Sequence, residues 1–228
     1  MATVTTPRTR FTTQLGLRSS GVLMTTEEFD ALPDKVFNRR LRYELINGVF
    51  IVTPPPGNGE IDPNDELGHL IWYFKEFDPR GSVVDKVLSE QTIYATPNRR
   101  RADRAIWLGL GRVPDVENDI PAIVVEFVSA KKRDHKRDYE EKKAEYLAIG
   151  VREYWIIDRF QRIMTVHRNL PEGVASLVVQ ETETYQTDLL PGFVLPLSRI
   201  LAKADDWPDK KAPKKRNPPR KPLEGDPR

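Results

Sequence analysis

One glutamate stands in the middle of an apolar segment of the chain. Glu126 occupies the fourth position of the sequence IVVEFV, which is typical of a buried strand. Burying an unpaired carboxylate is costly, so the fold must supply a cation, a basic partner or a proton. Two interpretations follow: an ion pair with one of the nearby arginines, or a site that does chemistry.

A second carboxylate lies in another extended segment. Asp103 stands in RRRADRAIWLGL, and one hairpin-like connection would bring it to Glu126. The chain has no cysteine and only three dispersed histidines, so a metal here would bind to oxygen, as Mg²⁺ or Mn²⁺ does. If the two carboxylates repel each other in the metal-free protein, changing either to its amide is expected to raise the melting temperature.

The segment after Glu126 predicts a helix that carries a lysine toward the acids. Asp138, Lys142 and Tyr146 are spaced four residues apart and share one helix face. The alternative for Lys142 is an exposed ion pair with Asp138, which would stabilise the helix by about 0.3–0.5 kcal/mol and leave Tyr146 in the core. Lys143 is the neighbouring candidate for the same role.

Basic residues are clustered although the net charge is only +2, from 36 basic and 34 acidic residues. General attraction to nucleic acid should therefore be weak, and only local clusters would contact phosphate. The clusters beside the two acids contain the candidates Arg101, Arg104, Lys131 and Lys132. The alternative for each cluster is a solvated surface.

The elements that must position these residues follow from local patterns. Asn47-Gly48 between alternating apolar residues predicts a hairpin with Glu44 in its first strand. Thr25 and Glu28 form a capping box for a short helix, and Asp62-Pro63 predicts the start of a longer one. Three extended segments are expected next: SVVDKVLS, QTIYA and ADRAIWLGL.

A β-α-β unit is expected to hold the centre of the domain. IVVEFVS and EYWIID read as buried strands, and the helix between them ends before Gly150. These two strands should be parallel neighbours. The strands RIMTVHR and ASLVVQ and a short helix in LLPGFVLPLSRIL complete the pattern of an α/β (α+β) domain.

The 228 residues fit one domain with tails. We expect a disordered N-terminal tail over 1–20, for which a transit peptide is the less favoured alternative, a domain over 21–202 and a disordered basic Pro/Lys-rich tail over 203–228. No apolar run approaches about 18 residues, so no membrane span is expected, and the absence of a signal peptide predicts a cytoplasmic protein.

An ordered set of segments resembles one protein family. These segments are MTTEEFDALP, YELINGVFIVTPPP, RADRAIW, IVVEFVSA, DYEEKKAEYLAIGVREYWIID and LLPGFVLPL. Together they are similar to the Uma-two (Uma2) family of the PD-(D/E)XK nuclease superfamily, over about residues 22–201. The resemblance implies a restriction-endonuclease-like core, a mixed sheet flanked by helices, with a divalent ion held by acidic residues.

Residue by residue, the resemblance places the family's two acids on Asp103 and Glu126, its lysine on Lys142 and its early glutamate on Glu44. In the commonest superfamily pattern the lysine follows the second acid by two residues, where this chain has Val128, so the helix must supply it. The resemblance thus implies that Asp103, Glu126 and Glu44 hold Mg²⁺ or Mn²⁺. Lys142 would orient or deprotonate the attacking water, or stabilise the pentavalent phosphate.

These observations predict a divalent-metal-dependent endonuclease that hydrolyses DNA and acts as a homodimer. Arg101, Arg104, Lys131 and Lys132 would grip the DNA backbone without reading bases. The alternative is a catalytically inactive module of the same fold that binds nucleic acid or a protein partner.

Overall fold

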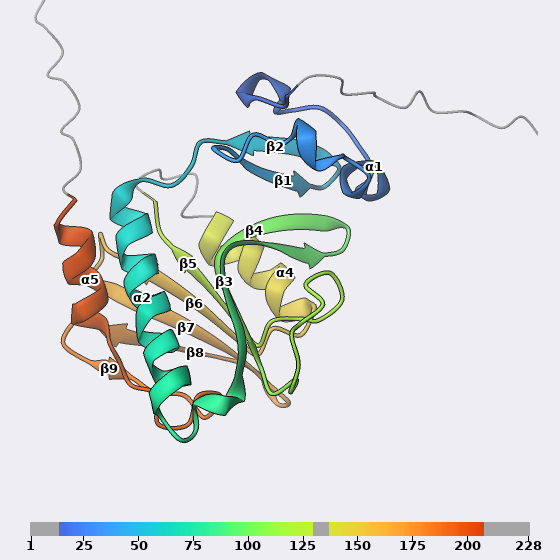
Figure 1. Cartoon of the computed structure of the whole chain (residues 1–228). Coiled ribbons are helices and arrows are strands. Elements are labelled where there is room, and N and C mark those ends of the chain that lie inside the picture. The colour runs from blue at the N-terminus through green and yellow to red at the C-terminus, as the bar shows by residue number, and fades with distance from the viewer. Residues whose placement is uncertain (1–13, 130–136, 208–228) are drawn as a thin grey trace, which may run out of the picture.

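The folded part of the chain is built on one mixed sheet of eight strands (Figure 1). The computed structural model describes residues 14–129 and 137–207. The strand order is β2-β1-β4-β5-β6-β7-β8, and β3 pairs with β4. The strands are β1 (Arg42–Ile46), β2 (Val49–Thr53), β3 (Val84–Ala95), β4 (Asn98–Leu108), β5 (Ile123–Phe127), β6 (Glu153–Asp158), β7 (Ile163–Leu170) and β8 (Gly173–Gln180). Two further strands, β9 (Thr184–Tyr185) and β10 (Leu195–Pro196), form a separate small sheet.

Helices cover both faces of the large sheet (Figure 1). The helical elements are α1 (Thr26–Asp30), α2 (Asn58–Phe77), α4 (Lys143–Ala148), α5 (Leu197–Asp205), the π-helical η4 (Arg137–Lys142) and the short η1 (Leu17–Ser19), η2 (Asp34–Val36) and η3 (Gly81–Val83). In β5, Val125 packs in one apolar cluster with Leu67 of α2, whereas Val124 packs in another with Tyr146 of α4. Side chains alternate along a strand, so Glu126 lies on the α4 side of the sheet.

The β1–β2 hairpin and the segment before it form a smaller lobe above the start of β4 (Figure 1). This lobe has its own apolar cluster, which includes Leu15, Phe29, Tyr43 and Phe50. The hairpin turn uses Asn47 and Gly48 with φ of 50° and 77°, as the primed turns of hairpins require. The lobe joins the sheet of the body where β1 pairs with β4, at Leu45 and Arg99.

Most of the predicted elements are present. The mixed sheet flanked by helices, the hairpin with Glu44 in its first strand and the parallel pairing of β5 with β6 are confirmed. The capping box at Thr25 is confirmed too, because its Oγ1 accepts from the Glu28 N–H at 3.2 Å. Gly150 follows the predicted helix with φ of 101°. No helix among the described residues is long and apolar enough to cross a membrane.

Three boundaries differ from the predictions. Helix α2 begins at Asn58, so Pro63 lies inside its second turn rather than at its first position, where its missing N–H removes the helical bond to the Gly59 carbonyl. SVVDKVLS and QTIYA form the single strand β3. Some described residues within the two predicted tails are structured: Leu15 is 2% exposed, and α5 continues to Asp205.

Candidate active site at a fork of the sheet

The candidate site lies where the neighbour of β4 changes. At its start β4 pairs with β1 at Arg99, and further along it pairs with β5 from Arg104 onward. Between these points three backbone groups of β4 are bonded by side chains rather than by a strand: Glu44 Oε1 accepts from Arg101 N at 3.0 Å, Lys142 Nζ donates to Arg101 O at 2.7 Å, and Asn64 Nδ2 donates to Asp103 O at 2.9 Å. The fork thus gathers polar side chains from three elements, β1, η4 and α2, around β4.

Asp103 and Glu126 face each other at this fork. The antiparallel register that pairs Arg104 with Val125 puts Asp103 opposite Glu126 one step further along. Both carboxylates are buried, with 3% and 2% of the residue exposed. Asp103 Oδ2 accepts from the Phe127 N–H at 2.6 Å, which ties the two strands together. The sequence prediction that one hairpin-like connection brings the two acids together is therefore confirmed.

Lys142 reaches Glu126 from the helical segment after β5. Its Nζ lies 2.8 Å from Glu126 Oε1, and both side chains are buried. The Tyr146 hydroxyl, one turn further on, donates to the same oxygen at 3.3 Å. Among the described residues the carboxylate of Glu126 is therefore paired with this lysine. Lys142 is buried rather than exposed, and the side chain of Asp138 lies outside the described residues.

Two charged groups that the sequence reading missed flank Asp103. Arg42 Nη2 lies 2.5 Å from Asp103 Oδ1. Burial lowers the pKa of Arg42, but the carboxylates of Asp103 and Glu90 outweigh it, so the pKa is raised above its ordinary value. Glu60, in the first turn of α2, has its pKa raised to about 7, first by burial and then by the negative charge of Asp103. Arg42 stands two residues before Glu44 on the same strand, and this spacing could have revealed it.

The other predicted site residues lie in different surroundings. Arg101 lines a cavity beside the fork. Arg104 is buried, and its guanidinium donates to Oδ1 and the carbonyl of Asn64 at 2.7 and 2.6 Å, so it faces α2. Lys131 and Lys132 lie outside the described residues. Lys143 is half-buried, and its charge adds to burial in lowering the pKa of His167, away from the two acids.

The donors at the fork suit a hard divalent cation. Asp103 and Glu126 present carboxylate oxygens from adjacent strands, and the apolar surroundings favour pairing these charges with a cation. In the arrangement seen here that partner is Lys142 for Glu126 and Arg42 for Asp103. No set of three His, Asp or Glu side chains converges as a metal site within residues 14–129 and 137–207. Glu44 is instead bonded to the Arg101 backbone.

The sequence places the chain in a family. The sequence model of the Uma2 family, described as "Putative restriction endonuclease", matches residues 26–198. The chain belongs to this family. The match includes all of β1 to β8, and therefore every residue of the fork. A search of the curated proteins gives no match.

A solved structure shares the fold. A crystal structure described as "a putative nuclease belonging to DUF820" from Anabaena variabilis ATCC 29413 superposes with a TM-score of 0.62. It is 15% identical in sequence, and the match covers 79% of this chain and 99% of that one. At this identity the likeness concerns the fold: the mixed sheet with its flanking helices is that of the neighbour, and the Uma2 match independently gives the family.

Proposed function

We propose that this protein is a Mg²⁺- or Mn²⁺-dependent endonuclease that hydrolyses phosphodiester bonds of DNA. The observation that carries the proposal is the fork itself, where Asp103, Glu126 and Lys142 meet although they come from three different elements. Membership of the Uma2 family supports the same reaction class.

In this proposal each residue of the fork has one task. Asp103 and Glu126 would hold the ion, which would supply Lewis-acid chemistry at the scissile phosphate and its attacking water. Lys142, already beside Glu126, orients the attacking water or stabilises the charge that develops on the phosphate. Tyr146 and the Arg101 carbonyl fix the lysine and the glutamate in place. Glu44 is a positioning residue or an outer ligand.

The test is nicking of a supercoiled plasmid by the purified full chain. We expect nicked and linear product with Mg²⁺ or Mn²⁺ and none after treatment with EDTA, because the candidate ligands are oxygens. Restoring the metal to the treated protein should restore cleavage. Cleavage that persists in EDTA would contradict the proposal.

Linear product that appears early, together with a dimeric mass by light scattering, would support the homodimer that we expect for double-strand cleavage.

A second candidate rests on the ion pairs of the fork. Asp103 and Glu126 are already neutralised by Arg42 and Lys142, which is also how a non-catalytic module would stabilise buried acids. Such a module would bind nucleic acid or a protein partner without cutting. It predicts DNA binding without cleavage in every metal tested.

A further inference from the structure

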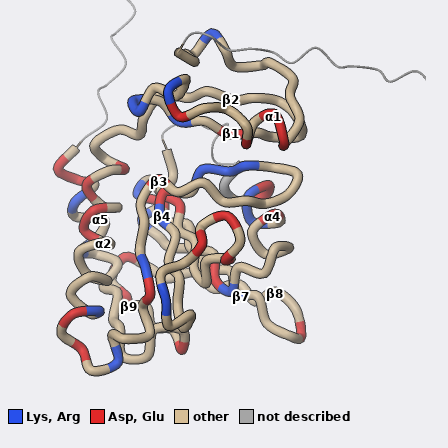
Figure 2. Tube along the Cα trace, turned by 45° about the vertical axis from the view of Figure 1, so that its right-hand side comes forward, with Lys and Arg blue, Asp and Glu red and all other residues tan. Residues whose placement is uncertain are grey.

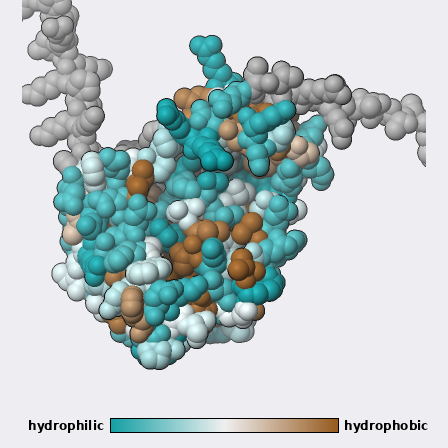
Figure 3. Space-filling model, viewed as in Figure 1, coloured by the Kyte–Doolittle hydropathy of each residue, from teal (hydrophilic) through white to brown (hydrophobic). Residues whose placement is uncertain are grey.

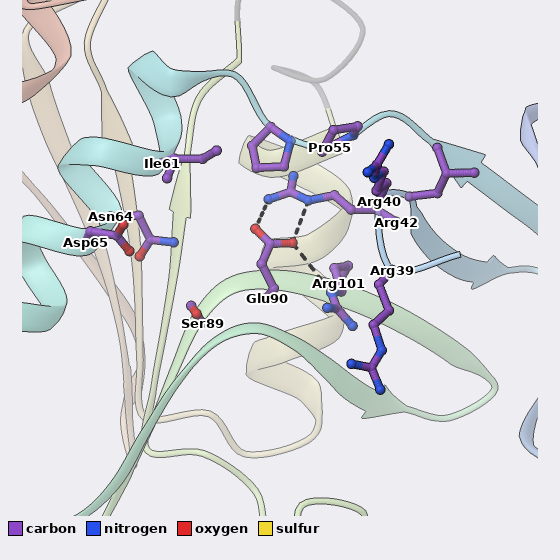
Figure 4. A pocket seen from close by; sticks show the side chains of 12 residues that line it. Arg39, Arg40, Arg42, Pro55, Ile61, Asn64, Asp65, Ser89, Glu90 and Arg101 are labelled. Carbon is purple, nitrogen blue, oxygen red and sulfur yellow. Dashed lines mark hydrogen bonds and ion pairs between the residues drawn. The ribbon is translucent and has the colours of Figure 1, made fainter. Parts of the chain in front are cut away.

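A basic cavity of about 300 Å³ opens beside the fork, between the hairpin lobe and the body. Four arginines line it: Arg39, Arg40, Arg42 and Arg101 (Figure 4). Basic residues also gather on β4 beneath the hairpin (Figure 2), and strongly hydrophilic side chains cover the surface where the lobe meets the body (Figure 3). The cavity contains one acid at its centre, Glu90, and a second, Asp65, at its α2 wall.

Glu90 occupies an unusual position in β3. Its φ is +52°, a left-handed value that residues other than glycine rarely adopt within a strand. The ladder keeps one register from Ser89–Arg104 to Gln91–Ala102, which puts Glu90 opposite Asp103. The left-handed backbone thus holds a carboxylate directly beside the candidate catalytic acid, where a second negative charge is unfavourable without a strong reason.

The carboxylate of Glu90 is clamped between two guanidinium groups. Arg42 binds it through Nε, at 2.6 Å, and through Nη2. Arg101 Nε lies 3.6 Å from Glu90 Oε2 (Figure 4). A forked carboxylate between two arginines has the shape and charge of a phosphodiester bound in the same place, because guanidinium groups bind both anions through paired N–H donors.

The clamp leaves donors unused. Arg101 Nε is buried and finds no hydrogen-bond acceptor in the described part of the chain. Arg39 and Arg40 are exposed at the rim, and neither forms an ion pair with an acid of residues 14–129 or 137–207. A buried donor without an acceptor is unfavourable, so the cavity is better suited to a larger anion than to Glu90 alone.

We propose that this cavity is a phosphate subsite for the nucleic-acid backbone, in which Glu90 holds Arg42 and Arg101 in place until a phosphodiester displaces its carboxylate. The inference rests on the proposed function and adds a defined contact to it. Arg42 also binds Asp103 Oδ1 at 2.5 Å, so a phosphate held by Arg42 lies next to the fork. The subsite would therefore position the strand whose neighbouring phosphate enters the active site.

The experiment measures DNA binding without cleavage. Fluorescence anisotropy of a labelled duplex is recorded in EDTA over a series of salt concentrations, for the full chain and for three variants. Arg39→Ala/Arg40→Ala removes the exposed donors, and Glu90→Gln removes the competing charge at constant size. Arg112→Ala is the matched control, because Arg112 is exposed and paired with Asp119 in the β4–β5 loop.

We expect Arg39→Ala/Arg40→Ala to weaken binding at least about tenfold and to lower the slope of log K against log salt by about one to two units. Glu90→Gln should tighten binding severalfold, whereas Arg112→Ala should leave affinity and slope unchanged. Unchanged binding by the double variant, or weaker binding by correctly folded Glu90→Gln, would overturn the subsite. Cleavage is assayed separately: loss of the subsite effect with Mg²⁺-dependent cleavage intact refutes only the subsite, and arginine-dependent binding with no cleavage refutes only the nuclease.

Discussion

Two glutamates are buried in adjacent strands of the same sheet, and their surroundings differ. Glu153, at the start of β6, accepts hydrogen bonds from Trp155 Nε1, Tyr185 Oη and Thr187 Oγ1 at 2.8, 2.9 and 2.6 Å. Glu126, near the end of β5, is paired with the ammonium group of Lys142 at the fork. Both residues are at most 3% exposed.

The two carboxylates differ in their hydrogen-bond and ion-pair partners and in the charged groups nearby. Around Glu153, three neutral donors satisfy the carboxylate, and among the described residues the half-buried Arg168 adds the one ion pair, at 3.3 Å. Burial and the Glu153 charge raise the pKa of Tyr185, which keeps its hydroxyl a donor. Around Glu126, a second acid, two cations and a basic cavity lie within the same fork. Burial alone therefore does not mark a candidate catalytic acid; the convergence of charged groups distinguishes Glu126 from Glu153.

The strongest test of this comparison is loss of cleavage. Glu126→Gln and Asp103→Asn should each reduce plasmid nicking per folded molecule by on the order of 10³, because each removes a metal ligand and charge from the fork. Glu153→Gln should leave the nicking rate per folded molecule unchanged. Equal losses per folded molecule from Glu126→Gln and Glu153→Gln would contradict the distinction between the two glutamates.

The same acid variants test the stability of the fork. Mutual repulsion of the two carboxylates predicts that the amides melt higher, but the structure pairs Asp103 with Arg42 and Glu126 with Lys142. Removing one partner of a buried pair leaves the other charge uncompensated and is destabilising by about 3–5 kcal/mol. We therefore expect lower melting temperatures for both variants, opposite to the direction expected from repulsion, and circular dichroism must confirm that the folded fraction suffices for the activity assay.

The lysine gives the next largest effect. Lys142→Met keeps the apolar stem but removes the ammonium group, so nicking should fall by about 10²–10⁴. Lys143→Met is the matched control, since Lys143 is turned about 100° around the helix and approaches His167 instead. Metal affinity, measured by calorimetry, should survive both changes because an ammonium group is not a ligand. A larger loss from Lys143→Met would contradict the assignment of Lys142.

The sequence could predict the acids and the fold around them for local reasons. Glu126 interrupts an apolar strand, Asn47-Gly48 specifies a hairpin, and the parallel pairing of β5 and β6 follows from the helix between them. Each signal lies within a few residues of the element that it specifies. The resemblance to the Uma2 family then added Glu44 and the role of Lys142.

The rest depends on contacts between distant segments. Asn64 comes from α2 and Arg42 from β1, and they meet Asp103 only because β4 exchanges neighbours at that point. The left-handed backbone of Glu90 gives no composition signal. Arg104 looked like a phosphate contact from its cluster, but tertiary packing turned it toward Asn64. Single-sequence patterns carry no information on such long-range contacts.

A smaller effect is expected at Glu153, on stability alone. Its carboxylate accepts from three buried donors, and the amide of glutamine would lose the negative charge and turn an NH2 group toward the Oε1 partners, which include the Arg168 guanidinium. Glu153→Gln should lower the free energy of unfolding by about 1–3 kcal/mol, measured by urea titration. Wild-type stability combined with lost cleavage would place Glu153 in the active site and remove the contrast with Glu126.

The smallest expected effect concerns the pH dependence of stability at the fork. Burial and the charge of Asp103 raise the pKa of Glu60 in the folded protein to about 7, above the ordinary value of 4.5. Between these values the folded state binds more protons than the unfolded state, so this group makes stability fall as pH rises from about 4.5 to 7 and adds a constant penalty above that range. Glu60→Gln removes the penalty. Its melting temperature should equal that of the wild type at pH 4 and exceed it by about 2–4 °C at pH 8.

Glu76→Gln, at an exposed position on the same helix, is the matched control and should show no such pH-dependent difference. A Glu60→Gln advantage that is largest at pH 4, or equal at both pH values, would mean that the negative charge of Asp103 does not act on α2, and the fork would then resemble the neutral surroundings of Glu153.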